Sequence, residues 1–321
     1  MPKKIKNICV IGIGGVGGYF GGRIAHKISS DNLNDMEVYF IGRGEHLKTV
    51  QQQGLKLITD EKEYNCFPNI ATENIRRIPA PDLYLLCVKG YDLDNAVSSI
   101  SKNISTDTVI LPLLNGVDID GRIRARLQKA IVTPAAVYVS SSIEKAGIIR
   151  QKGPEGHIVF GKDPKRLNYD YKPMINFFKE MKISFDWYDN PYPAIWEKYI
   201  FIAAFSLMTA YSKKTIGGVL KDQKLRKMTE DIMNEVVSVG KANNVELREN
   251  IVEETIQKAQ NFPGETKTSF QRDYEKGKEK NEGDIFGGTL IRMAKEHNID
   301  IPVTSKVYKQ LISETNQGTV L

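Results

Sequence analysis

Residues Ile8–Gly22 read ICVIGIGGVGGYFGG, an apolar strand that runs directly into a glycine-rich loop. In the spacing Gly12-x-Gly14-x-x-Gly17, the first glycine permits a tight turn, the second lets a pyrophosphate approach the backbone, and the third lets a helix pack on the strand. The phosphates would lie at the N-terminus of that helix, where unpaired N–H groups and the helix dipole favour negative charge. The stretch therefore predicts a dinucleotide site formed by Gly12, Ile13, Gly14, Gly15, Val16 and Gly17.

The composition is that of an ordinary globular protein and favours two domains. The chain has 321 residues, of which 41% are hydrophobic and 26% charged. A chain of this length is too long to fold around one modest hydrophobic core. The net charge of +6 suits a small anionic ligand. Because the basic residues are dispersed among acidic ones, we expect no nucleic-acid partner.

The cysteines and the apolar segments predict a cytoplasmic protein without a membrane-spanning helix. The three cysteines form no CxxC pair, we expect no metal site, and no signal peptide is evident, which favours a reducing compartment. The most apolar stretch, Tyr199–Tyr211, lies between Lys198 and Lys213 and is shorter than the ~20 residues that a spanning helix needs. We therefore expect a buried core helix.

The N-terminal part alternates strand and helix patterns, which predicts a parallel sheet with crossover helices. The expected strands and extended segments are Lys6–Ile11, Glu37–Ile41, Gln51–Asp60, Glu63–Phe67, Leu83–Val88 and Thr108–Leu114, and the expected helices are Val16–Ser29 and Asp92–Ile100. Three further segments look like an antiparallel meander that completes this sheet: Ile131–Ser141, Gly147–Lys152 and His157–Gly161.

The pattern changes at Asp186–Pro193, where two prolines and several polar residues indicate a boundary. Beyond it the chain is helix-patterned, over Ala194–Ser212, Lys221–Asn243, Asn250–Asn261 and Gly287–His297. We expect an α/β fold with a Rossmann-like NADP-binding domain over residues 1–188 and an all-helical substrate and catalytic domain over residues 189–321.

The residue after the second strand predicts which dinucleotide binds. An NAD site normally carries Asp or Glu there, but this turn reads Ile41-Gly42-Arg43-Gly44. A guanidinium can bind a 2′-phosphate through bidentate, charge-assisted hydrogen bonds. Arg43 as an ordinary solvated surface residue is the alternative. The glycine loop upstream makes NADPH/NADP the better prediction.

Polar residues at two strand ends are further candidates, because ligands of open α/β sheets lie beyond the carboxyl ends of the strands. Lys89 follows one buried strand and would flank the cofactor's phosphates, or it is only a strand-end lysine with a buried stem. Asn115 follows another and would contact the nicotinamide ribose, or Asn115-Gly116 is a plain turn.

Lys198 stands at the head of the apolar helix, close to the predicted boundary. Desolvation would bring the pKa of this lysine towards the range of a general acid, which carbonyl reduction needs. From the local sequence alone, a capping or interface lysine is the simpler interpretation.

Taken together, these motifs resemble the ketopantoate reductases (2-dehydropantoate 2-reductases), NADPH-dependent enzymes of pantothenate biosynthesis, over nearly the whole chain. Besides the glycine loop, the matching segments are YFIGRGEHL (39–47), LYLLCVKGYD (83–92), LLNGVD (113–118), HIVFGKD (157–163), WEKYIFIAA (196–204), TKTSFQRDYEKGK (266–278), NEGDIFGG (281–288) and EHNIDIPVT (296–304). The resemblance implies hydride transfer to the keto carbon of a 2-oxo acid. It leaves open whether the protein is a monomer or a homodimer.

The resemblance also implies roles for individual residues. Lys198 would donate the proton, Ser269 would hold the substrate carboxylate, and Glu282 would contact the cofactor and position the reacting groups. The cofactor residues would be the glycine loop, Arg43, Lys89 and Asn115. The match of Glu282 requires one extra residue after Asp273. Without the resemblance, Ser269 and Glu282 look like part of a solvated helix face.

Three positions depart from the family pattern. The family carries asparagines where this chain has Ile202, Ser206 and, farther along, a residue near Ile216. Those amides bond the substrate's hydroxyl and keto groups, which isoleucine cannot do, although Ser206 keeps a hydroxyl for the substrate. A pocket without such donors discriminates less against analogues that lack the hydroxyl.

Three hypotheses follow. The first is an NADPH-dependent 2-oxo acid reductase acting on ketopantoate or, as a variant, on a more apolar 2-oxo acid. The second is a non-catalytic NADPH-binding sensor, against which Lys198 argues, since a binder needs no proton donor. A relative of the 3-hydroxyacid or 6-phosphogluconate dehydrogenases ranks third, because their lysine-centred motif is not evident.

Overall fold

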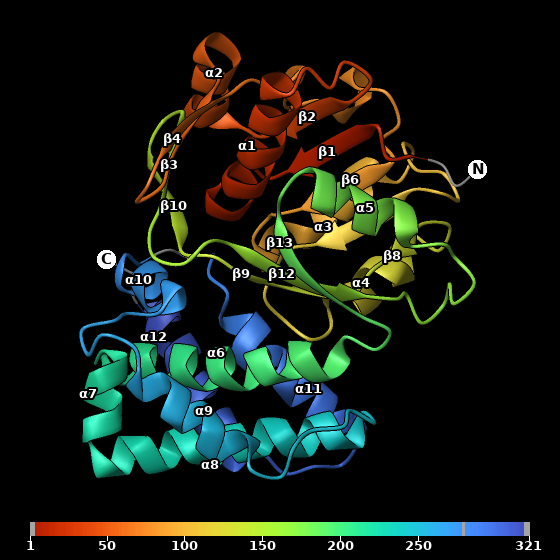
Figure 1. The fold of residues 1–321 in the computed structure, drawn as a ribbon. Helices are drawn as coiled ribbons and strands as arrows, with labels where there is room; N and C mark the ends of the chain where they lie inside the picture. The colour runs from red at the N-terminus through yellow and green to blue at the C-terminus, as the bar shows by residue number, and fades with distance from the viewer. Residues whose placement is uncertain (1–3, 278–279, 318–321) are drawn as a thin grey trace. The chain divides into compact units, whose positions relative to one another are not determined.

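The computed structural model describes residues 4–277 and 280–317, and the chain divides into two compact units (Figure 1). Unit 1 comprises the chain through Asn115 together with Ile119–Pro191, and unit 2 comprises Gly116–Asp118 together with the chain from Tyr192 onward. We predicted the division after residue 188, and in the structure it lies after Pro191.

Unit 1 contains a parallel sheet of six strands in the order β5-β2-β1-β6-β7-β8. The strands are β1 (Asn7–Ile11), β2 (Glu37–Ile41), β5 (Ile70–Thr72), β6 (Leu83–Leu86), β7 (Val109–Pro112) and β8 (Ile131–Val132). The interior of β1 is fully buried. Since β2 flanks β1 on one side and β6 on the other, the strand order reverses at β1, where ligands of such sheets bind. The predicted Rossmann-like domain is confirmed.

The helices of unit 1 connect strands of this sheet and of the two smaller sheets described below. They are α1 (Gly15–Ser30), α2 (Gly44–Gln53), η1 (Ile75–Arg77), η2 (Gly90–Asp92), α3 (Leu93–Ile100), α4 (Ile119–Arg126) and α5 (Lys172–Glu180). Extended structure was predicted from Gln51, but Gln51–Gln53 form the last turn of α2. Gly54, with φ +77°, ends that helix, and the strand begins only afterwards. The segment is polar, and the sequence pattern missed this helix and α5.

Two smaller sheets replace the predicted meander. One has the order β10-β11-β3-β4 and the other β13-β12-β9. Their strands are β3 (Leu55–Ile58), β4 (Glu63–Cys66), β9 (Ala135–Tyr138), β10 (Ser141–Lys145), β11 (Ile148–Gln151), β12 (His157–Gly161) and β13 (Ser184–Tyr188). The predicted antiparallel pairing is present between β10 and β11 and between β9 and β12. The prediction of one meander that completes the main sheet was wrong, because these pairs lie in separate sheets, where β11 also pairs in parallel with β3 and β12 with β13. Both partners come from distant parts of the chain.

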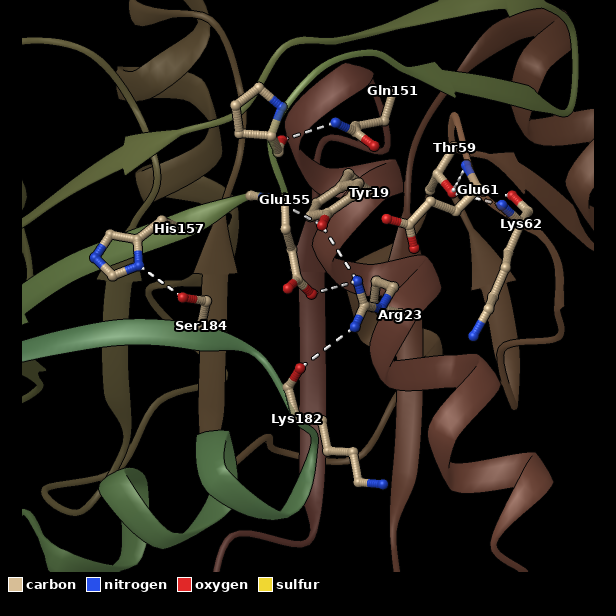
Figure 2. A network of polar contacts seen from close by, with 12 residues as sticks. Tyr19, Arg23, Thr59, Glu61, Lys62, Gln151, Glu155, His157, Lys182 and Ser184 are labelled. Carbon is tan, nitrogen blue, oxygen red and sulfur yellow. Dashed lines mark hydrogen bonds and ion pairs between the residues drawn. The ribbon is translucent and has the colours of Figure 1, made fainter.

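A polar network fixes α1, the helix that carries the glycine loop at its N-terminus (Figure 2). The Arg23 guanidinium donates to Tyr19 Oη at 3.2 Å, to Glu155 Oε1 at 2.7 Å and to the Lys182 carbonyl at 3.3 Å. Tyr19 Oη in turn accepts from the Gly156 N–H at 2.9 Å. The network therefore ties α1 to the chain just before β12 and just before β13.

The described secondary structure of unit 2 is helical. It comprises α6 (Tyr192–Ser212), α7 (Ile216–Lys221), α8 (Gln223–Ala242), α9 (Ile251–Gln260), α10 (Ser269–Glu275), the π-helix η3 (Asp284–Gly288), α11 (Thr289–Glu296) and α12 (Pro302–Gln317). Helix α6 packs against α8, α10 and α12 (Figure 1), as expected for a core helix. Among the described residues, no helix has the length and apolarity to cross a membrane.

Candidate functional site

Three glycines of the glycine loop in unit 1 are required by close packing. Gly12 has φ +87°, and a Cβ there would lie 2.9 Å from the Cys87 carbonyl oxygen on the neighbouring strand end. A Cβ at Gly17 would lie 2.0 Å from the Gly12 carbonyl oxygen, and one at Gly15 would lie 2.3 Å from that of Ser141. Side chains at these three positions would therefore collide with the protein itself.

Gly14 differs from the other loop glycines. It caps the N-terminus of α1, and a Cβ placed on it would meet no protein atom within 4 Å. Packing within the described protein does not require glycine there. A ligand that lies against the backbone would require glycine at this position, as the dinucleotide fingerprint predicts for its middle glycine.

A cavity of about 580 Å³ opens at this loop. Its lining includes Gly12, Ile13, Gly14, Arg43 and Lys89, so the structure brings together five of the predicted cofactor residues. Gly15, Val16 and Gly17 continue from the loop into α1. Asn115 is partly buried beyond the end of β7, the neighbour of β6 in the sheet.

Arg43 is 80% exposed, and its Nη2 lies 2.8 Å from Asp92 Oδ2. It caps the N-terminus of α2. The guanidinium therefore stands at the cavity edge, as predicted, but it already has an acidic partner. Asp92 and Glu73 also line the cavity, and the motif analysis did not select either of them.

His46 is a third residue that the sequence analysis missed. Its ring lines the cavity, and Nδ1 accepts from the Gly147 N–H at 3.0 Å. Burial lowers the pKa of His46 below its ordinary value, so the neutral ring carries its proton on Nε2. An interaction with the Ile13 backbone raises the pKa of the ring and opposes the effect of burial, and Nε2 makes no other hydrogen bond among the described residues.

In unit 2, Lys198 lies on α6 and is partly buried. Burial lowers the pKa of its ammonium to about 8, although the negative charge of Glu282 acts in the opposite direction. Glu282 is itself only 4% exposed, so it does not belong to a solvated helix face. A lysine with such a pKa can donate a proton near neutral pH and accept one slightly above it.

Glu282 precedes an irregular helix that is anchored to α6. The chain enters the π-helix η3 at Asp284, a geometry often found at functional sites. The Tyr199 hydroxyl donates to the Ile285 carbonyl at 2.6 Å and lies 3.3 Å from that of Phe286. Because Tyr199 follows Lys198 directly, the bond links the lysine's helix to the segment that carries Glu282.

The predicted substrate residues lie in different environments. Lys198, Ile202 and Ser206 recur every four residues and share one face of α6, and Ser206 is 3% exposed. Ser269 is exposed at the first position of α10, and Thr268 beside it bonds Thr209 of α6 at 2.9 Å. Ile216 is 2% exposed and packs inside unit 2.

Two family models cover most of the chain. Residues 8–165 match "Ketopantoate reductase PanE/ApbA", and residues 191–313 match "Ketopantoate reductase PanE/ApbA C terminal".

Individual relatives are distant but match over most of their length. An uncharacterized oxidoreductase of Bacillus subtilis, YkpB, is 25% identical over 94% of this chain and 96% of its own. A 2-dehydropantoate 2-reductase of Mesorhizobium japonicum is 24% identical over 84% and 86%. The crystal structure of 2-dehydropantoate 2-reductase from Porphyromonas gingivalis has a TM-score of 0.82 and 25% identity, covering 96% of this chain and 100% of that one. The chain belongs to the ketopantoate reductase family, whose members are oxidoreductases that depend on NAD(P).

Proposed function

We propose that the protein is an NAD(P)H-dependent reductase of 2-oxo acids, with ketopantoate as the first substrate to test. The observation that carries the proposal is the Lys198 ammonium on α6, whose pKa of about 8 suits a general acid. The open backbone at Gly14 supports a bound dinucleotide in unit 1.

A nicotinamide cofactor would supply the hydride for the C2 carbonyl carbon in the proposed reaction. The α1 N-terminus, Arg43 and Lys89 would hold its phosphates, and Asn115 would orient the nicotinamide ribose. Lys198 Nζ–H protonates the alkoxide as it forms, leaving a neutral amine that water reprotonates. Ser206 and Ser269 hold the substrate, and Glu282 keeps Lys198 charged through its own negative charge.

A panel of 2-oxo acids tests the substrate. Ile202 shares the Lys198 face of α6 and offers no hydrogen bond. The kcat/KM values for ketopantoate and for 3,3-dimethyl-2-oxobutanoate, which differs only in lacking the hydroxyl, should therefore agree to within about tenfold. The measurement is NADPH oxidation followed by absorbance. Ile202→Asn should raise the preference for ketopantoate, whereas the exposed substitution Lys221→Met should leave it unchanged.

The panel also separates the enzyme from a binding protein. Tight NADPH binding without turnover of any 2-oxo acid would contradict the reductase and favour the sensor. A strong preference of the wild-type protein for ketopantoate would instead contradict the role given to Ile202.

Tyr199→Phe tests the anchor between α6 and η3. Loss of the bond to Ile285 should lower kcat about tenfold, the effect of one buried hydrogen bond, with little change in cofactor affinity. If Glu282 moves away, its support of the Lys198 charge weakens, and the alkaline limb of the kcat profile shifts to lower pH. Tyr211→Phe, near the end of the same helix, is the matched control. A lower kcat with an unmoved pH profile would show a merely structural role.

A further inference from the structure

Strand pairing brings a carboxylate to the end of β2. The turn directly after β2, Gly42-Arg43-Gly44, contains an arginine and no acid. In the sheet, β5 runs parallel to β2 with Ile41 opposite Thr72, and the Gly42 N–H donates to the Thr72 carbonyl at 3.2 Å. The next residue, Glu73, therefore stands beside the Gly42–Arg43 turn.

Glu73 is held at the adenosine end of the cavity. Its Oε1 accepts from the Gly44 N–H at 3.2 Å, at the first residue of α2, where the helix dipole favours a negative charge. The residue is exposed and lines the same cavity as Gly12 and Arg43. Its carboxylate is thus anchored to the backbone and open to a ligand.

The charges around this cavity are balanced. Among the described lining residues, the cations Arg43 and Lys89 are matched by the carboxylates Glu73 and Asp92. Asp92 Oδ2 lies 2.8 Å from Arg43 Nη2, and Glu73 occupies the N–H of Gly44. A 2′-phosphate at Arg43 would therefore meet two carboxylates, whereas ribose hydroxyls find acceptors in them.

We propose that Glu73 is the ribose-binding carboxylate of this site, supplied by β5 in place of β2, and that the site binds NADH about as well as NADPH. The inference rests on the proposed dinucleotide binding in unit 1. Arg43 attracts the 2′-phosphate, and Glu73 and Asp92 oppose it. The preference for NADPH that Arg43 alone predicts is thereby reduced.

Separate titrations of the full-length protein with NADPH and NADH, followed by nicotinamide fluorescence, test the proposal. For the wild-type protein the two Kd values should differ by less than about tenfold. Glu73→Gln should lower Kd for NADPH and raise Kd for NADH, changing their ratio by about tenfold or more. Asp92→Asn, which frees Arg43, should strengthen NADPH binding alone.

Glu45→Gln is the matched control, because Glu45 carries the same charge in the first turn of α2 and is 77% exposed, pairing only loosely with Lys48. Its ratio of Kd values should stay at the wild-type value. If Glu73→Gln melts like wild type and leaves the ratio unchanged, the proposal is wrong although dinucleotide binding stands. If the wild-type protein binds neither cofactor, the proposed function itself fails.

Discussion

Replacing Lys198 with methionine should lower kcat for 2-oxo acid reduction by about a thousandfold, within the usual range for a lost general acid. The cofactor Kd should stay at its wild-type value, because Lys198 has no proposed role in holding the cofactor, whose proposed phosphate-binding residues all belong to unit 1. Steady-state kinetics and a fluorescence titration measure the two quantities. A fully active Lys198→Met variant would show that the proton donor is another group.

The dependence of the reduction rate on pH tests the same role of Lys198. Burial brings the pKa of Lys198 to about 8, and reduction needs the protonated form. Activity should therefore be constant below this pH and fall as the pH rises through it, while oxidation of the hydroxy acid should change in the opposite sense. In the Lys198→Met variant, the residual activity should no longer fall as the pH rises through this value.

Stability measurements separate chemistry from folding in this variant. Methionine has a similar length and removes a charge that burial disfavours, so Lys198→Met should unfold at the wild-type temperature or above. Lys221→Met, at the exposed end of α7, is the matched control and should retain full kcat. A lower melting temperature for Lys198→Met would attribute the loss of activity to misfolding.

Gly14→Ala should weaken dinucleotide binding by about a hundredfold, equivalent to about 2.7 kcal/mol, while the protein remains folded. The added Cβ meets no protein atom within 4 Å, but it occupies the side from which a pyrophosphate would approach. Alanine is a poorer N-cap than glycine, at a cost of about 1 kcal/mol, which a stable domain tolerates. Titration with NADPH and thermal melting measure the two effects.

Two other glycines provide the comparison. Gly121→Ala, on α4, also adds a Cβ that meets nothing within 4 Å. It should leave Kd unchanged and should not lower the melting temperature, because alanine is the better helix former. At Gly17 the Cβ would lie 2.0 Å from the Gly12 carbonyl oxygen, so alanine there should destabilise the fold. Unchanged NADPH binding in Gly14→Ala would exclude a pyrophosphate at the loop.

The predictions from sequence succeeded where the determining signal is local. The buried strands, the glycine loop and the apolar helix around Lys198 are each encoded in neighbouring residues, through apolar runs and glycine spacing. They failed where distant segments pair: β11 with β3, and β12 with β13. Helix α2 was missed because its sequence is largely polar and only Leu47 and Val50 are buried.

The sequence by itself determined the Rossmann-like domain, the glycine loop and the place of Lys198 on the apolar helix, because each depends on residues that are close in the chain. The tertiary structure decided which polar and charged groups surround these elements. The register of β5 on β2 brings Glu73 beside Arg43, and the bond from Tyr199 to Ile285 anchors the segment of Glu282 on α6. Desolvation and charge pairing depend on which distant groups surround a side chain, and local sequence patterns do not contain that information.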